Sequence, residues 1–133
     1  IDVIGKKIKV VNEVANALGL TNVKAEQKAA NSVKQEFDFI VSRAVTKMED
    51  FVKWTKGKIA KKQNHEIKNG ILYLKGGDLT EELASFQNAS LYNLTDYFQD
   101  EFFETKKVVH IPLKKRWYLL VFIQKIKGKF VLN

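Results

Sequence analysis

The chain has 133 residues, with 23 Lys or Arg against 15 Asp or Glu, a formal net charge of +8 and a sequence pI near 9.6. This length favours one domain, and 45% hydrophobic with 29% charged residues excludes a disordered chain. The absence of cysteine excludes a disulfide framework and fits a reducing compartment, while no apolar run reaches the roughly 18–20 residues of a membrane span. The positive charge favours a polyanionic partner; the alternative is an ordinary basic protein.

The first part of the chain predicts a helix followed by a short strand. Apolar residues recur at helical spacing from Ile4 to Leu18, and Gly19 stands where a C-terminal cap is expected. We therefore predict a helix over residues 6–18 and a short strand over residues 22–27.

The segment FDFIVSRAV alternates Phe37, Phe39 and Val41 on one face, which predicts a mostly buried strand over residues 37–42. This strand runs directly into Arg43, a residue type that is rarely buried without a partner. The arginine either faces a ligand or forms a structural ion pair with a nearby carboxylate.

The rest of the chain continues the alternation of helices and strands. Two glycines stop one apolar strand, and an Asp with a Glu three residues later resembles a helix start. The predicted elements are a helix over 47–60, a strand over 70–77, a short helix over 79–86 capped by Asp78 with Glu81, and two antiparallel closing strands over 90–98 and 106–114.

This order of elements predicts an α/β fold, with a mostly parallel sheet and a C-terminal antiparallel strand pair. Ligands of such sheets bind beyond the carboxyl ends of the strands. Four polar residues stand at predicted strand ends, and we expect them on one rim: Asp2, Gln27, Arg43 and Lys75.

The sequence contains no recognisable pattern for an acid–base catalytic site or a metal site. There is no cysteine, and neither His65 nor His110 stands in a triad or at metal-ligand spacing. No Walker phosphate loop and no G-x-G-x-x-G motif occurs. We expect no metal site.

Two further features each have two interpretations. Asp2 is either an acceptor for a ribose diol or a carboxylate that favours the start of the following helix. A basic run is either a solvated helix face or a set of phosphate contacts, if it lies on the rim. The run consists of Lys53, Lys56, Lys58, Lys61 and Lys62.

Three stretches in this order, IDVIGKKIKVVNEVANALGLTNVKAEQ, FDFIVSRAV and ILYLKGG, resemble the bacterial 16S ribosomal RNA guanine-N7 methyltransferases of the RsmG family, also called glucose-inhibited division protein B. The resemblance runs through about Leu113. It implies a Rossmann-like class I fold, S-adenosyl-L-methionine as cofactor, and methylation of guanine N7 in the decoding-region loop of 16S RNA. It also implies a cytoplasmic, monomeric enzyme that acts on the small ribosomal subunit, without a membrane or a metal.

The resemblance further implies how the chain is organised. Residues 1–115 resemble the C-terminal part of the methyltransferase domain, and residues 116–133 form an unassigned basic and apolar tail. The first strand and the glycine-rich loop of the family are expected to precede Ile1.

The family's functional positions can be carried over one at a time. Asp2 would hold the cofactor's ribose, and Ala30 with Asn31 would lie near the adenine, although both charged residues of the family's Arg-Ala-Glu stretch are changed here. A register one residue earlier, over residues 28–30, is the alternative. Arg43 matches the arginine of the Ser-Arg-Ala motif, which implies cofactor or RNA contact, and Lys75 matches the lysine of Lys-Gly. These two residues are the candidates for a catalytic role.

The small number of candidate catalytic side chains is consistent with this reaction, because guanine N7 carries a free lone pair and its methylation needs no proton removal. Two alternatives stay open: a class I methyltransferase with another substrate, and a non-catalytic basic RNA-binding module. Cofactor binding distinguishes the module from the enzymes.

Overall fold

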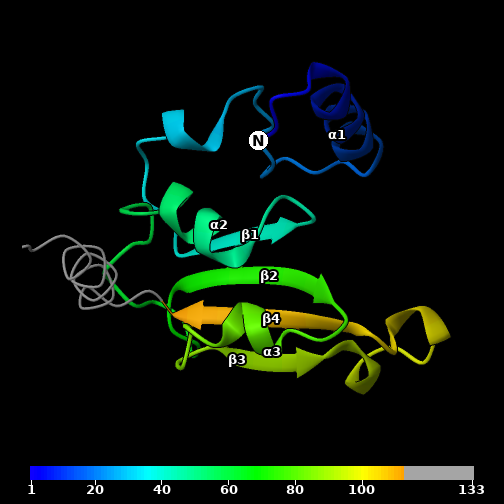
Figure 1. The fold of residues 1–133 in the computed structure, drawn as a ribbon. Helices are drawn as coiled ribbons and strands as arrows, with labels where there is room; N and C mark the ends of the chain where they lie inside the picture. The colour runs from blue at the N-terminus through cyan, green and yellow to red at the C-terminus, as the bar shows by residue number, and fades with distance from the viewer. Residues whose placement is uncertain (113–133) are drawn as a thin grey trace, which may run out of the picture.

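The computed structural model describes residues 1–112, so the tail over residues 116–133 lies outside the described residues (Figure 1). Four strands form one sheet in the order β1-β2-β4-β3. Their bounds are β1 Phe39–Arg43, β2 Gly70–Gly76, β3 Ser90–Asn93 and β4 Lys106–Pro112.

The sheet is mixed, so the prediction of a mostly parallel sheet is wrong for the described residues. β1 pairs with β2 in parallel, whereas β4 pairs antiparallel with both β2 and β3. The chain turns back after β3 and inserts β4 between β2 and β3, and each new pairing is therefore antiparallel. The predicted C-terminal antiparallel strand pair is confirmed.

Within residues 1–112, three α-helices accompany the sheet, and the first agrees with its prediction within a residue. The second ends six residues before the predicted limit of 60, because the Thr55 hydroxyl donates to the carbonyls of Phe51 and Val52 and Gly57 takes a left-handed φ of 74°. The bounds are α1 Gly5–Ala17, α2 Met48–Trp54 and α3 Thr80–Leu83, with 3₁₀ turns η1 Ala30–Ser32, η2 Leu94–Asp96 and η3 Glu101–Phe103.

The predicted strand over residues 22–27 is wrong. In this segment only Gln27 has a strand-like partner, through an isolated parallel bridge to Asp2. A strand needs a hydrogen-bonded neighbour along its length. Among the described residues this segment has one only beside Asp2, whose N–H donates to the Glu26 carbonyl oxygen at 3.4 Å.

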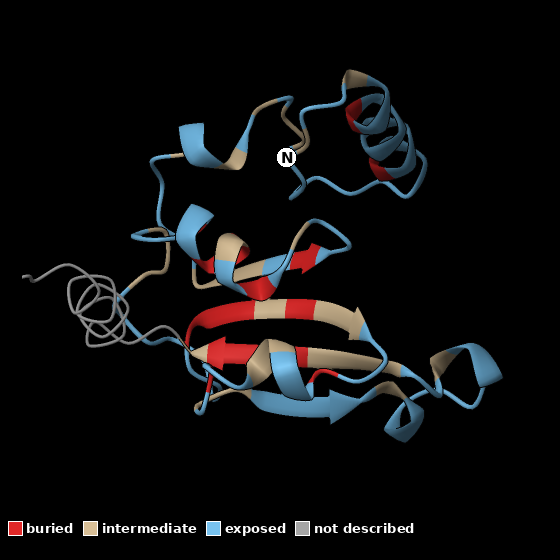
Figure 2. Cartoon of the chain, in the orientation of Figure 1, coloured by how far each residue is buried: buried red, intermediate tan, exposed pale blue. Residues whose placement is uncertain are grey.

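The core lies between one face of the sheet and the helices α2 and α3. Alternate residues of β2 and β4 are fully buried on this face, and the Tyr73 ring stacks on Phe51 of α2 at 4.9 Å. Figure 2 shows this burial gathered on the two central strands and on the side of α2 that faces them. The buried cluster consists of Met48, Phe51, Val52, Ile71, Tyr73, Leu79, Phe86, Val109 and Ile111, and it contains no residue of α1.

The prediction of a mostly buried strand over residues 37–42 is confirmed for only one face of β1. Ile40 packs on the core and Ser42 is buried, whereas Val41 is 64% exposed. The register explains this result, because Ile40 and Ser42 lie beside Ile71 and Tyr73 of the buried face of β2. Among the described residues β1 is an edge strand, and the face that carries Phe39 and Val41 has no helix packed on it in the core cluster. In the part of the chain that the structure describes, no helix is long and apolar enough to cross a membrane.

Candidate functional site

One edge of the sheet collects the strand ends that carry the candidate residues. β1 and β2 are parallel, so Arg43 lies beside Leu74 and Lys75 follows directly. β3 points the same way because both it and β2 are antiparallel to β4, and the amino end of β4 therefore reaches this edge too. We call this edge, formed by the ends of β1, β2 and β3 and the start of β4, the carboxyl rim (Figure 1, right of the sheet).

Arg43 is exposed on the carboxyl rim, and within residues 1–112 its side chain has no hydrogen-bond or ion-pair partner. Two carboxylates near Arg43 in the sequence have other partners. Asp38 contacts His65 and Asn69, and Asp50 pairs with Lys53. The guanidinium therefore keeps its planar fork of donors for a carboxylate or phosphate.

Lys75 lies at the end of β2, but its ammonium group is already bound within the protein. The side chain is 17% exposed, and Nζ lies 2.8 Å from Oε1 of Glu82 and 3.2 Å from the carbonyl oxygen of Thr46. Lys75 therefore contacts the loop between β1 and α2 rather than open solvent.

Asp2 makes the contacts expected of a carboxylate before a helix. Its Oδ1 accepts the N–H of Ile4 at 2.8 Å, and its Oδ2 lies 3.4 Å from the exposed ammonium of Lys7. The Ile4 N–H, followed by Lys7, lowers the pKa of Asp2 below its ordinary value. The carboxylate stays ionised at neutral pH, and Oδ2 keeps lone pairs free for a further donor such as a ribose hydroxyl.

Ala30 and Asn31 begin the short η1 turn, where the first backbone N–H groups of a helical turn have no internal partner. Within the described part of the chain, the N–H groups of both residues have no acceptor. Their backbone can therefore donate to a ligand without the charged side chains that the related family has here.

The four strand-end residues form two pairs. Gln27 bridges to Asp2 and donates its side-chain amide to the Val3 carbonyl at 3.0 Å, outside the four-stranded sheet. Arg43 and Lys75 belong to adjacent strands of the sheet. The predicted single rim is thus confirmed for Arg43 with Lys75, and no strand pairing of the described residues joins it to Asp2 and Gln27.

The second half of the basic run lies at the opposite edge of the sheet. Phe37, two residues before β1 begins, bridges to Ile59, so the segment after α2 lies beside the amino end of β1. In Figure 1 this segment is on the left, away from the carboxyl rim. The condition under which the run was expected to contact a rim-bound phosphate is therefore not met.

Individual lysines of the run differ in their surroundings. Lys53 pairs with Asp50 at 2.8 Å, which raises the pKa of Lys53 and lowers that of Asp50. Lys58 donates to the carbonyl oxygen of Val33. Lys61 and Lys62 are exposed. Lys56 follows α2 in the turn and is also exposed.

Sequence reasoning missed two basic residues of the carboxyl rim. Lys106 and Lys107 begin β4, and their partners in the sheet are Gly76 and Lys75 at the end of β2. The Lys107 ammonium lies 3.4 Å from the Gly77 carbonyl oxygen, and that of Lys106 lies 5.0 Å from the Phe102 ring centre. The signal was present as a Lys-Lys pair before the last strand, but only an antiparallel return brings the start of a strand to this rim.

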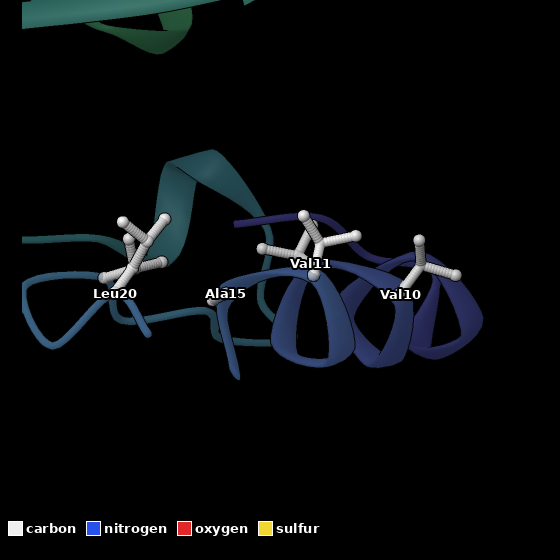
Figure 3. Close-up of a pocket in the computed structure, with 6 residues that line it drawn as sticks. Val10, Val11, Ala15 and Leu20 are labelled. Carbon is white, nitrogen blue, oxygen red and sulfur yellow. The ribbon is translucent and has the colours of Figure 1, made fainter. Parts of the chain in front are cut away.

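An apolar pocket beside α1 is lined by none of these residues. It has a volume of about 280 Å³ beside α1, and Figure 3 shows Val10, Val11, Ala15 and Leu20 along it. Val14 and Val23 complete an entirely apolar lining. Cofactor sites need a few polar groups to orient the ligand, and this pocket offers none. In residues 1–112 no three His, Asp or Glu side chains gather as metal ligands.

The fold and the carboxyl rim define an α/β protein of the kind that binds its ligand beyond the ends of parallel strands. Residues 1–110 match the GidB family, rRNA small subunit methyltransferase G. The chain belongs to this family.

Its curated relatives carry the same name. The chain is 69% identical over 114 residues to ribosomal RNA small subunit methyltransferase G from Flavobacterium johnsoniae, covering 86% of this chain and 54% of the relative, and 69% identical over 114 residues to that from Flavobacterium psychrophilum, with the same coverage. The protein of that name from Cytophaga hutchinsonii is 47% identical over 113 residues, 84% of this chain and 55% of the relative. The chain thus spans about half the length of these relatives. No solved structure matches it.

Proposed function

We propose that the protein transfers a methyl group from S-adenosyl-L-methionine to N7 of a guanine in the decoding-region loop of 16S ribosomal RNA. The observation that carries this proposal is the match of residues 1–110 to the rRNA methyltransferase family. Residues 1–115 then belong to a Rossmann-like class I methyltransferase domain. The partner is the small ribosomal subunit, and the enzyme acts as a cytoplasmic monomer.

Two features of the described residues fit the adenosine part of the cofactor. The Asp2 carboxylate is ionised and partly exposed, and its Oδ2 is held only by the exposed Lys7, so it can accept from a ribose hydroxyl. The N–H groups of Ala30 and Asn31 are free donors for an adenine nitrogen. We therefore assign ribose contact to Asp2 and adenine contact to the backbone of Ala30 and Asn31.

Arg43 is the group we assign to the reacting end of the site. When bound, S-adenosyl-L-methionine supplies a methyl group on a positively charged sulfur. The Arg43 fork can hold either a carboxylate or an RNA phosphate against the carboxyl rim. Either contact fixes the distance and angle between the donor and the guanine, which is the main contribution that alignment makes to the rate.

No side chain has to move a proton in this reaction. Guanine N7 would supply the electron pair for the new bond to the methyl carbon, and the bound cofactor would keep the pair of the broken carbon–sulfur bond on sulfur. N7 has a lone pair and no hydrogen, so a general base is unnecessary. The two histidines are accordingly free for structural roles: His110 is buried against the Lys68 carbonyl oxygen at 2.8 Å, and His65 contacts Asp38.

The test is methyl transfer by the protein expressed from its complete gene. The protein is incubated with labelled S-adenosyl-L-methionine and small ribosomal subunits from a strain that lacks the modification. We expect label in 16S RNA, at one guanine whose N7 methylation makes the strand sensitive to reduction and aniline cleavage. Label in another RNA or on another atom would support a class I methyltransferase with a different substrate.

Calorimetric titration with S-adenosylhomocysteine distinguishes the proposed enzyme from a non-catalytic RNA-binding module. An enzyme of this class binds the product cofactor, and a non-catalytic basic RNA-binding module does not. RNA binding without any heat of cofactor binding would therefore contradict the proposed function. The lysine run, at the edge opposite to the carboxyl rim, remains a prediction for additional RNA contact.

A further inference from the structure

The loop between β1 and α2 has an unusual division between its backbone and its side chains. Arg43, Val45 and Lys47 are exposed. The backbone between them is hydrogen-bonded to groups inside the fold. Ala44 takes a left-handed φ of 50°, which is unfavourable for residues other than glycine. Contacts from elsewhere in the fold must therefore hold this conformation.

The first contact comes from Tyr73, which is fully buried in the middle of β2. Its hydroxyl accepts the N–H groups of Val45 at 3.2 Å and Thr46 at 2.9 Å, and it donates to the Thr46 carbonyl oxygen at 2.7 Å. The hydroxyl uses its donor and both acceptor sites on two consecutive loop residues. Its ring is held by stacking on Phe51.

The second contact is the ion pair of Lys75 and Glu82. The Lys75 ammonium donates to the same Thr46 carbonyl oxygen and lies 4.3 Å from the centre of the Tyr73 ring. Glu82 Oε1 accepts this ammonium at 2.8 Å and also the Met48 N–H at 2.7 Å. The Met48 N–H is one of the unpaired donors at the start of α2. The pair thus holds the second half of the loop, at Thr46 and at Met48.

We propose that Tyr73, Lys75 and Glu82 form a loop clamp whose function is to position the Arg43 guanidinium for methyl transfer. The clamp members are positioning residues, and Lys75 contacts neither RNA nor cofactor. This inference rests on the proposed function. Glu82 and Tyr73 join the site only through the tertiary structure, because they lie 34 and 27 residues away from the loop atoms that they bind.

The first test is a double-mutant cycle in the protein expressed from its complete gene. Tyr73→Phe keeps the buried ring and removes the three loop hydrogen bonds. We expect turnover at saturating substrates to fall about tenfold, and less than about twofold when the same change is made in an Arg43→Ala background. Tyr92→Phe, the same change at an exposed tyrosine of β3, should leave turnover unchanged. An equal loss in both backgrounds would overturn the clamp, since Tyr73 would then act independently of Arg43.

The second test separates positioning by Lys75 from phosphate contact. Lys75→Met removes the charge, and the slope of log affinity for small-subunit RNA against log salt concentration should not change while turnover falls. A slope reduced by about 0.7–0.9 would show a phosphate contact and overturn the assignment. Glu82→Gln keeps an oxygen for Met48 and Lys75, so it should retain more turnover than Glu82→Ala; equal losses would count against the clamp.

Hydrogen exchange tests the clamp without relying on methyl transfer. In Tyr73→Phe the amides of Val45 and Thr46 should exchange more than about tenfold faster, while those of the β2–β4 ladder keep their protection. Unchanged exchange at both amides would overturn the clamp. Faster exchange in a protein whose wild type transfers no methyl group would support the clamp and reject the proposed function.

Discussion

The side-chain amide of Asn69 donates to the Asp38 carboxylate over 3.0 Å, and this contact joins the start of β2 to the start of β1. The same nitrogen faces the carbonyl oxygens of Ala60 at 3.1 Å and Lys62 at 2.8 Å. Asn69 is 2% exposed, so its amide holds the segment that carries part of the basic run at the amino edge of the sheet. Three acceptors around one nitrogen require a donor at this position.

Asn69→Asp should therefore destabilise the fold. The change replaces the donor with an acceptor that faces three oxygens, one of them a carboxylate. We expect the free energy of unfolding in urea to fall by at least about 2 kcal/mol. Asn93→Asp, at an exposed position of β3, should stay within about 0.5 kcal/mol of the wild type. Equal effects of the two changes would show that the Asn69 contacts contribute nothing.

Arg43→Lys should impair methyl transfer without affecting stability. Lysine keeps the charge and loses the planar fork, so kcat/KM should fall more than tenfold, or about 1.4 kcal/mol in the barrier. The melting temperature should change little because the side chain is exposed and unpaired among the described residues. A variant that melts much earlier, with near-normal turnover per folded molecule, would make Arg43 a structural residue.

Asp2→Asn should weaken cofactor binding. Asparagine can still accept the Ile4 N–H, but it lacks the second charged oxygen for a ribose hydroxyl. We expect calorimetry to show about tenfold or more weaker binding of S-adenosylhomocysteine, because a hydrogen bond to a charged group contributes about 1.5–3 kcal/mol. Lys7→Gln, which removes only the ion pair, is the control and should bind nearly as the wild type does. If Asp2→Asn binds the cofactor as the wild type does, the Asp2 carboxylate only stabilises the start of the following helix.

Charges at the two edges of the sheet should differ in their effect on RNA binding. Lys106→Gln with Lys107→Gln removes charge from the carboxyl rim, and Lys61→Gln with Lys62→Gln removes the same charge from the opposite edge. We expect the rim variant to lower the slope of log affinity against log salt concentration more than the other variant does. The slope should fall by about 0.7–0.9 for each phosphate contact that is lost. The reverse ranking would make the basic run the RNA surface.

Thr80→Val should change the pH dependence of stability. The Thr80 hydroxyl, followed by the Thr80 N–H, lowers the pKa of Asp78 below its ordinary value of 3.8. The folded state then binds the Asp78 proton more weakly than the unfolded chain, so this stabilisation is complete above pH 3.8 and is lost as the pH falls through the lowered pKa. The variant should return the pKa of Asp78 towards 3.8, and NMR titration of the carboxyl group measures it. Thr95→Val, at an exposed threonine, is the control and should leave the pKa of Asp78 unchanged. If Thr80→Val also leaves it unchanged, Thr80 is not the cause of the lowered pKa.

The start of α3 shows how accurately a short sequence pattern predicts the first residue of a helix. The predicted pair of Asp78 and Glu81 places the helix start correctly within two residues, and Asp78 does accept from the backbone of Thr80. The helix itself begins at Thr80 after Leu79, so Asp78 forms a turn before the helix. The hydrogen bonds that short polar side chains make to nearby backbone can be predicted from the sequence. The residue at which the helix then begins depends on how neighbouring segments pack.

The amino-acid sequence alone was enough to predict the features that depend on neighbours along the chain. Helical spacing from Ile4 to Leu18 predicted α1, and the apolar run before two glycines predicted β2. The order of short motifs indicated the family, and the end of the run FDFIVS placed Arg43 at the end of a strand. These features need only the periodicity and order of residues.

Three features could be seen only in the folded protein. They are the buried face of β1, the position of the basic run away from the carboxyl rim, and the contact of Lys75 with Glu82. Each depends on which strand becomes the neighbour of which. Alternation along β1 defines two faces but not the one that meets Tyr73, and a lysine at a strand end is free or engaged according to residues distant in the chain. The antiparallel return of β4 likewise brings Lys107 beside Lys75, because pairing between distant segments, and not local pattern, sets the order of strands in a sheet.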